Sequence, residues 1–257
     1  MIILLPPSEA KRPAQAGRPA INFPELSFPE LTEARERVTQ VLSQVSAQPD
    51  ALQILKVGQS LQAEVEHNIK LLSQPAHPAH RVYSGVLFEA LDYASLTPGQ
   101  KRAAEKSVLI ISALWGALRL QDCIPSYRLT MSTRLADCGN LATFWRGELE
   151  PVLTPYSSKQ IIIDCRSSTY LKAWQPAPER TVQIRVVRED PSGSQKVVSH
   201  MAKHYRGLLV RYLLTHQLHT INSVKEFCQA LATDWRFNFK PAEPGAAAQL
   251  TLIIPSP

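Results

Sequence analysis

Long apolar runs are missing from this chain of 257 residues. No stretch approaches the roughly 18 apolar residues that a membrane helix needs, so we expect no membrane contact. The apolar run after Met1 is short and has no basic residues before it, which argues against a secretory signal. Both absences predict a cytoplasmic protein.

Cysteines are few, and their spacing matches no known metal or disulfide motif. None forms a C-x-x-C pair or has a histidine partner close by, and a long chain without an export signal rarely depends on disulfides. We expect reduced thiols, no zinc or other metal site, and no cofactor. The four residues are Cys123, Cys138, Cys165 and Cys228.

Catalytic signatures are also absent. The chain contains no G-x-S-x-G elbow, Walker loop or H-E-x-x-H motif. What it does contain is a moderate excess of positive charge, with 28 Lys and Arg against 22 Asp and Glu. That excess permits nucleic acid, nucleotides or other anions as partners, although it also suits plain solubility.

Prolines outnumber glycines by 20 to 10, and many of them stand at element boundaries, where they stop helices. Residues 12–30 predict an irregular arm, and residues 31–45 an amphipathic helix. Other segments predict strands at 2–5, 108–111, 160–164 and 250–254, a hairpin with arms 181–187 and 195–199, and helices starting at 97 and 201. This order predicts an α/β (α+β) fold, a single domain over residues 1–257 whose mixed sheet is flanked by helices.

The segment Ser107–Met131 is the most informative part of the chain. Its apolar start predicts a strand covered on both faces, and Trp115-Gly116 predicts a turn. Arg119, Tyr127 and Arg128 follow, and guanidinium groups match phosphate or carboxylate oxygens. The segment therefore predicts either part of an anion site or an ordinary loop whose arginines form surface ion pairs.

Residues 50–72 predict two short helices, at 50–55 and 59–72, joined through Val57-Gly58. Such a pair is typical of a helix-hairpin-helix, which presents backbone amides to a DNA phosphate. A simple corner between two helices has the same pattern, so the sequence leaves both readings open.

Four predicted strand exits combine hydroxyl groups with basic side chains. If the sheet brings these exits together, they form a basic cleft that binds anions at the ends of the strands. Ser167 could equally cap the helix that follows it. The candidate anion or nucleic-acid binding residues are Lys11, Arg119, Tyr127, Arg128, Arg166, Ser167, Lys203 and Arg206.

A few of these residues are also candidates for catalysis. Ser8 with Lys11, or Tyr170 with Lys172, would supply a nucleophile or an acid and base if burial lowered the lysine pKa. Asp164 is a candidate base, or a cap or arginine partner. The sequence does not establish whether the protein is an enzyme.

Several motifs together resemble the YaaA peroxide-stress-resistance family over nearly the whole chain. The resemblance rests on Ser112–Arg119 and Tyr127–Met131, and on further elements at Pro6–Lys11, Tyr83–Gly85, Phe144-Trp145, Ser167–Lys172 and Lys203–Gly207. It implies a cytosolic protein that limits free iron and oxidative DNA damage. It also implies a positively charged cleft and DNA binding by a helix-hairpin-helix-like element near residues 50–72.

Two functions follow as hypotheses. The first is binding of DNA or another polyanion through the basic cleft during the response to peroxide. The second is an enzyme that acts on a small phosphorylated or carboxylated metabolite such as a nucleotide. The second predicts one pocket that holds Lys11, Arg119, Arg128, Tyr170, Lys203 and Arg206. A third reading, a plain scaffold, would require every arginine to be paired with an acid. The sequence does not establish the oligomeric state.

Overall fold

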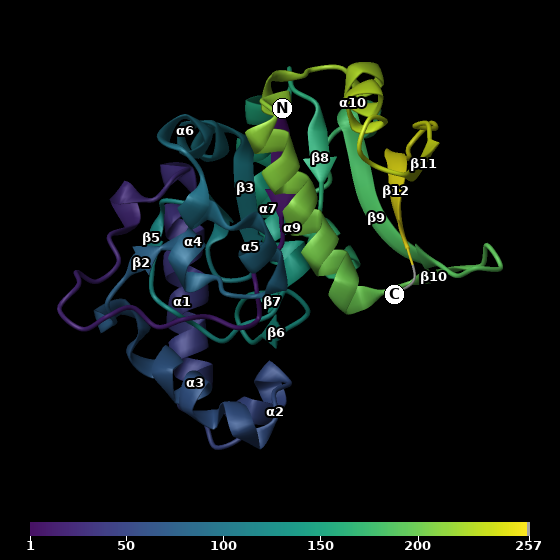
Figure 1. Cartoon of the computed structure of the whole chain (residues 1–257). Coiled ribbons are helices and arrows are strands. Elements are labelled where there is room, and N and C mark those ends of the chain that lie inside the picture. Colours follow the sequence, from purple (N-terminus) through teal and green to yellow (C-terminus); the bar gives the residue numbers. More distant parts are fainter. Residues whose placement is uncertain (256–257) are drawn as a thin grey trace.

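An eight-stranded mixed sheet runs through the protein, as seen in a computed structural model that describes residues 1–255 (Figure 1). The strand order is β11-β12-β9-β8-β1-β3-β4, and β10 pairs with β9 outside this path. The strands span Ile2–Leu5 (β1), Val108–Ser112 (β3), Gly116–Leu118 (β4), Ile162–Asp164 (β8), Thr181–Glu189 (β9), Gln195–Val197 (β10), Phe237–Lys240 (β11) and Ala248–Pro255 (β12).

The central strands are parallel and buried. β1 pairs in parallel with β3 on one side and β8 on the other, and all three strands are buried throughout. Continuous apolar runs of this kind suit strands covered on both faces. The predicted strands at 2–5, 108–111 and 160–164 and the mixed sheet are therefore confirmed.

The chain changes direction across the sheet at β1. From β1 it continues to β3 on one side, and later returns to β8 and then β9 on the other side. The carboxyl ends of these parallel strands meet at one edge. Ligands of open α/β sheets bind in the crevice outside such a switch point.

A short strand turns the chain back after β3. β4 pairs antiparallel with β3, with Ser112 opposite Gly116 and Ile110 opposite Leu118. Gly116 has φ +67°, and an added Cβ would overlap the ring of Trp145, so glycine is required at this turn. Arg119 is consequently carried away from the carboxyl edge, and the expectation that it follows a strand exit there is wrong.

Helices cover the sheet. α9 (Ser199–Thr215) crosses it in front in Figure 1 and packs against α5 (Val86–Leu91). Gly207 makes this contact possible, because an added Cβ there would overlap the carbonyl oxygen of Leu87. The predicted helix start at 97 is confirmed in α6 (Pro98–Ser107), which begins with a capping box. The helix expected from residue 31 is α1 (Thr32–Ser46), and α7 spans Leu141–Ser157.

The predicted helix pair at residues 50–72 is present as a chain of short pieces. α2 (Ala51–Leu55) ends at Lys56 in the left-handed conformation, and η3 (Gln59–Leu61), α3 (Gln62–His67) and η4 (Asn68–Ser73) follow. Figure 1 shows α2 and α3 below the rest of the molecule, on the side of the carboxyl ends of the central strands. The DNA-binding role of this element stays a prediction.

The predicted hairpin is confirmed. β10 pairs antiparallel with β9, and Asp190 Oδ1 accepts the amides of Ser192 and Ser194, both at 3.0 Å, which closes the turn.

In residues 1–255 no helix is long and apolar enough to cross a membrane. The remaining elements are β2 (His77–Pro78), α4 (Ala79–Val82), β5 (Cys123–Ile124), β6 (Arg134–Leu135), β7 (Gly139–Asn140), α8 (Ser168–Leu171), α10 (Val224–Leu231) and the 3-10 turns η1 (Phe23–Glu25), η2 (Pro29–Leu31), η5 (Tyr93–Ser95), η6 (Pro178–Arg180) and η7 (Leu218–Thr220).

Candidate functional site

The loop after β1 lies at the switch point and is fixed by neighbouring residues. Ser8 Oγ accepts the amide of Ser84 at 3.1 Å and donates to the carbonyl of Ala10 at 2.5 Å. Gly85 allows this approach, because an added Cβ would overlap Ser8 Cβ. The Ser8 hydroxyl therefore holds the loop against the segment that follows α4.

The amine of Lys11 lies at the end of this loop. Lys11 is half-buried, and its Nζ donates to the carbonyls of Ser8 at 2.9 Å and Glu9 at 3.2 Å. Nζ also lies 4.3 Å from the ring centre of Tyr127 and 5.8 Å from that of Tyr83. Aromatic rings on one side shield the amine from water.

This environment changes the acidity of Lys11. Its pKa is lowered to about 7, mainly by burial and in smaller part by the nearby positive charge of Arg128, while Glu64 and Glu9 act in the opposite direction. The two carbonyl acceptors and the ring of Tyr127 also favour the ammonium form. A lysine perturbed by burial in a crevice is a typical functional residue.

Buried hydroxyl groups lie behind the lysine. Tyr127 Oη is 3.0 Å from Tyr83 Oη and 2.8 Å from Ser112 Oγ, at the carboxyl end of β3. Burial raises the pKa values of both tyrosines, so both stay protonated at neutral pH. Burial and the proximity of Tyr127 raise the pKa of Tyr170 as well. Tyr170, on α8, therefore lies near this cluster.

Arg128 connects the cluster to α3. Its Nε and Nη2 bind Glu64 Oε2 at 2.9 and 2.5 Å, and its backbone is held by the buried side chain of Asn68. A cavity of about 320 Å³ lies between α3 and the loop after β1. We call it the Lys11 pocket; its lining residues are Lys11, Pro13, Ala63, Glu64, His67, Ser126 and Tyr127.

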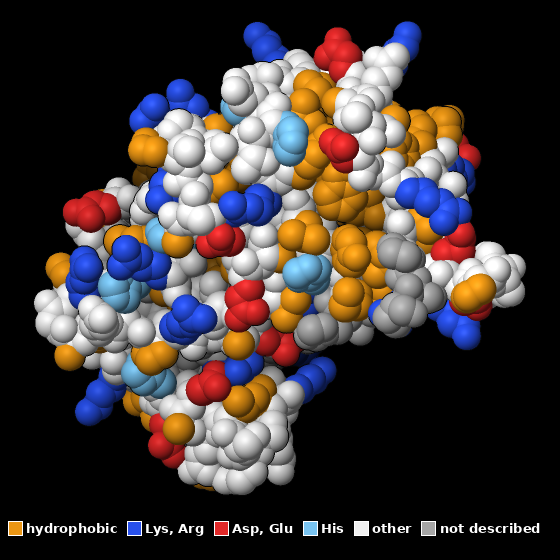
Figure 2. All heavy atoms as spheres, viewed as in Figure 1, with side chains coloured by type: hydrophobic (Ala, Val, Ile, Leu, Met, Phe, Trp, Pro, Cys, Tyr) orange, Lys and Arg blue, Asp and Glu red, His pale blue; other side chains and the backbone are white. Residues whose placement is uncertain are grey.

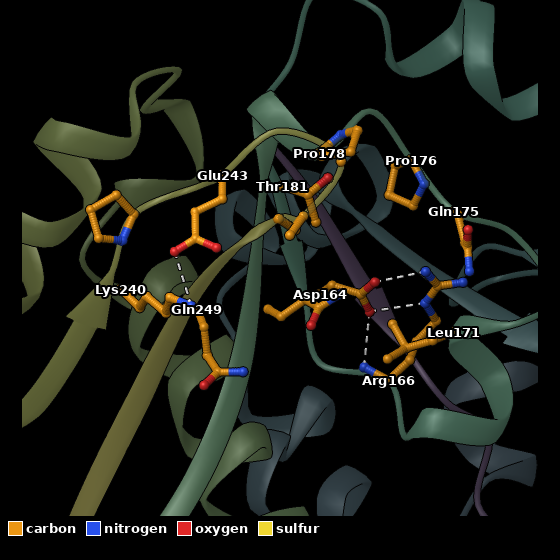
Figure 3. A pocket seen from close by; sticks show the side chains of 15 residues that line it. Asp164, Arg166, Leu171, Gln175, Pro176, Pro178, Thr181, Lys240, Glu243 and Gln249 are labelled. Atoms are coloured by element: carbon orange, nitrogen blue, oxygen red, sulfur yellow. Dashed lines mark hydrogen bonds and ion pairs between the residues drawn. The ribbon is translucent and has the colours of Figure 1, made fainter.

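Asp164 and Arg166 lie in a different hollow, shown in Figure 3. Arg166 binds both oxygens of Asp164, with Nη2 at 2.6 Å from Oδ2, and donates to the carbonyls of Tyr170 and Trp174. Lys240 and Glu243 pair across the rim at 3.0 Å. The charged side chains that line this hollow thus bind one another, and Asp164 holds the loop after β8 in place.

The other predicted residues are spread over the molecule. Arg119 donates to the carbonyl of Glu105 and, at 2.7 Å, to Tyr156 Oη. Arg206 donates to the carbonyl of Ile184 at 3.0 Å, whereas Lys172 and Lys203 are exposed. Ser167 stands at the N-cap of α8 without a side-chain capping bond. Of the six residues expected in one pocket, only Lys11 lines the Lys11 pocket. Arg128 and Tyr170 lie next to it, whereas Arg119, Lys203 and Arg206 do not line it, so this pocket does not hold the six together.

A second cluster of basic side chains was not predicted. A hollow of about 850 Å³ lies beside the Lys11 pocket, and Pro13 lines both. Figure 2 shows Lys, Arg and His side chains gathered around β2 and β5. We call this region the basic hollow; its basic lining residues are Arg12, Arg18, His77, His80, Arg81 and Lys101, and its acidic ones are Glu89 and Asp92.

The lowered pKa values of the two histidines reflect the positive charges around the hollow. The pKa of His80 is lowered to about 4, mainly by burial and in smaller part by the positive charges of Arg81 and Lys101. Burial, Arg18 and Arg81 lower the pKa of His77, whose Nδ1 is buried with no hydrogen-bond partner in the described chain. The basic side chains therefore lie close together in the hollow, although they come from three separate segments of the chain. The basic run from His77 to Arg81 was the available signal in the sequence.

Among the side chains that the structure describes, which exclude those of residues 199, 200 and 255–257, no three His, Cys, Asp or Glu are grouped so that they could hold a metal ion. All four cysteines are free thiols. Burial raises the pKa of Cys165 to about 12, which keeps that thiol protonated and unreactive.

Comparison with known proteins identifies the family. The model of the family described as peroxide stress protein YaaA matches residues 1–240. A UPF0246 protein of Corynebacterium efficiens is 41% identical over 258 residues, which cover 99% of this chain and 100% of that protein. A UPF0246 protein of Streptomyces coelicolor is 41% identical over 216 residues and 83% of each chain. One from Corynebacterium glutamicum is 39% identical over 260 residues, 99% of this chain and 100% of that protein. The chain belongs to the YaaA peroxide stress protein family.

Proposed function

We propose that this protein acts in the response to peroxide by binding DNA or another polyanion through the basic hollow. By binding DNA, the protein would limit oxidative damage to it. The family resemblance implies that the protein also lowers the amount of free iron. The observation that carries the proposal is the cluster of four Lys and Arg side chains against two carboxylates.

The hollow has the chemistry that a phosphate backbone needs. Arg12, Arg18 and Arg81 are exposed, so their guanidinium groups can form bidentate bonds with phosphate oxygens. Lys101 is held in position by the carbonyl of Ala94 at 2.8 Å. One of the two acids, Asp92, lies 3.5 Å from Arg211, which offsets its charge.

The proposed polyanion site lies away from the strand exits. The guanidinium groups expected there have partners within the chain: Arg128 binds Glu64, Arg166 binds Asp164, and Arg206 binds a carbonyl. Breaking the buried pair of Arg166 and Asp164 to bind phosphate would leave a carboxylate without its partner, which is costly. We also propose that the turn after α2, with exposed Lys56, makes a second contact with the polyanion.

Fluorescence anisotropy with a labelled duplex of about two helical turns tests the proposal. Replacing Arg81 and Lys101 by Gln is expected to weaken binding by about tenfold or more at low salt, because both phosphate contacts are lost. A matched double variant, Arg180→Gln with Lys225→Gln, loses the same charge at exposed positions outside the hollow and should bind almost as wild type. Equal loss in both variants would contradict the proposal.

An enzyme acting on a small phosphorylated or carboxylated metabolite is the second candidate. The Lys11 pocket favours it, because a purely electrostatic surface for DNA has no need of a half-buried lysine over two protonated tyrosines. Its volume of about 320 Å³ is within the range of small-molecule sites.

A further inference from the structure

We propose that the amine of Lys11 forms an imine with a small aldehyde or ketone bound in the Lys11 pocket. This reaction is separate from polyanion binding in the basic hollow. It gives the second candidate function a substrate class and a chemical step, and to that extent it depends on that candidate.

Although the carbonyl contacts of Lys11 favour the ammonium form, they also leave a neutral amine able to act as a nucleophile. A neutral amine has two N–H bonds and one lone pair, and the carbonyls of Ser8 and Glu9 accept two N–H bonds. The lone pair of the neutral amine is then not engaged by either carbonyl and is available for reaction. Because Lys11 also lines the pocket, a carbonyl carbon can reach the nitrogen from that side.

The charges around the amine are nearly balanced. The groups that face it are Glu9 from its own loop, Glu64 and His67 from α3, Arg128, and the rings of Tyr83 and Tyr127. Glu64 is bound to Arg128 and is therefore not a counter-ion dedicated to the lysine. With a pKa of about 7, Lys11 is about half neutral at pH 7, against roughly one in a thousand or fewer for an ordinary lysine.

The reaction balances without an oxidant or a reductant. The nitrogen lone pair attacks the carbonyl carbon, a C–N bond forms, and the C=O π bond breaks to give a carbinolamine. The nitrogen loses one proton and the oxygen gains one, with solvent water as the carrier. Loss of water then gives the C=N bond. A lysine desolvated in an apolar pocket is an established type of imine-forming nucleophile.

Reductive trapping on the full-length protein tests this proposal. The protein is incubated at pH 7 with glycolaldehyde or with pyruvate and cyanoborohydride, and adducts are located by peptide mass spectrometry. With at least one probe, Lys11 is expected to react about tenfold or more faster than exposed Lys172 and Lys196, with a rate that is half-maximal near pH 7. Lys11→Arg should abolish the fast adduct, and Lys196→Arg should leave it unchanged.

Two outcomes would overturn the proposal. One is labelling of Lys11 at the rate of the exposed lysines with both probes. The other is a pH dependence with a midpoint near 10. Circular dichroism checks that Lys11→Arg is folded. Because DNA binding is measured separately on the Arg81 and Lys101 variants, failure of imine formation leaves the polyanion proposal standing, and the reverse also holds.

Discussion

Lys11 makes the stability of the protein depend on pH. Its pKa is about 7 in the folded chain and about 10.4 when unfolded, so the folded state binds fewer protons between these values. The resulting penalty is complete below about pH 7 and disappears as the pH rises towards 10.4. Lys11→Met lacks this titration. The free energy of unfolding of the wild type should therefore rise relative to the variant from pH 7 to pH 10.

Urea unfolding of both proteins at several pH values measures this difference directly. The comparison isolates Lys11, because every other titrating group is common to the two chains. A difference that stays constant over the range would mean that Lys11 titrates as an exposed lysine, and the account of its burial would be wrong.

The Asp164–Arg166 pair is a second residue-scale test. Both side chains are almost fully buried, with exposed fractions of 1% and 0%. Asp164→Asn leaves the guanidinium charge without its partner, so we expect a loss of about 3–5 kcal/mol in the free energy of unfolding. The exposed pair at the rim of the same hollow supplies the control, because Lys240→Gln should cost less than about 1 kcal/mol. Similar losses in chemical denaturation would contradict this.

Individual residues were only partly predictable. Lys11 and Ser8 were found because their loop follows a recognisable strand, and pairing with arginine was one of the readings considered for Asp164. The position of Arg119 was not found, since it depends on β4, a strand of three residues without a period of its own. The basic hollow was missed because its side chains converge only through tertiary packing.

At the scale of elements, the close crossing of α5 and α9 depends on Gly207. Alanine is about 1 kcal/mol better than glycine inside a helix, but its Cβ at this position would overlap the carbonyl oxygen of Leu87. Overpacking typically costs about 1–3 kcal/mol, so we expect Gly207→Ala to destabilise the protein. Gly147 in α7 has open space around its Cα, and Gly147→Ala should be neutral or stabilising. Thermal unfolding of both variants compares the two; a stabilised Gly207→Ala would contradict the contact.

Most elements with a clear period or strong turn signals were predicted. The central strands, the hairpin and the helices beginning near residues 31, 97 and 201 were confirmed. α7 was not predicted, because Pro151 and Pro155 normally stop a helix. Its buried residues Trp145, Leu149 and Leu153 recur every four positions. Their packing against the core outweighs the local effect of the prolines.

At the scale of the whole molecule, two chemically different hollows lie side by side. The basic hollow and the Lys11 pocket share Pro13, and the loop after β1 separates them near the carboxyl edge of the sheet. The sequence predicted anion binding near the strand exits, whereas the exposed cations lie beside that edge.

The salt dependence of DNA binding tests the central claim most directly. Each phosphate contact contributes about 0.9 to the slope of log K against log salt concentration. The Arg81→Gln and Lys101→Gln double variant should therefore have a slope smaller by about two than the wild type, with the slope of the Arg180→Gln and Lys225→Gln control unchanged. Binding that does not depend on salt, or the same slope in all three proteins, would contradict the assignment of the basic hollow as the polyanion site.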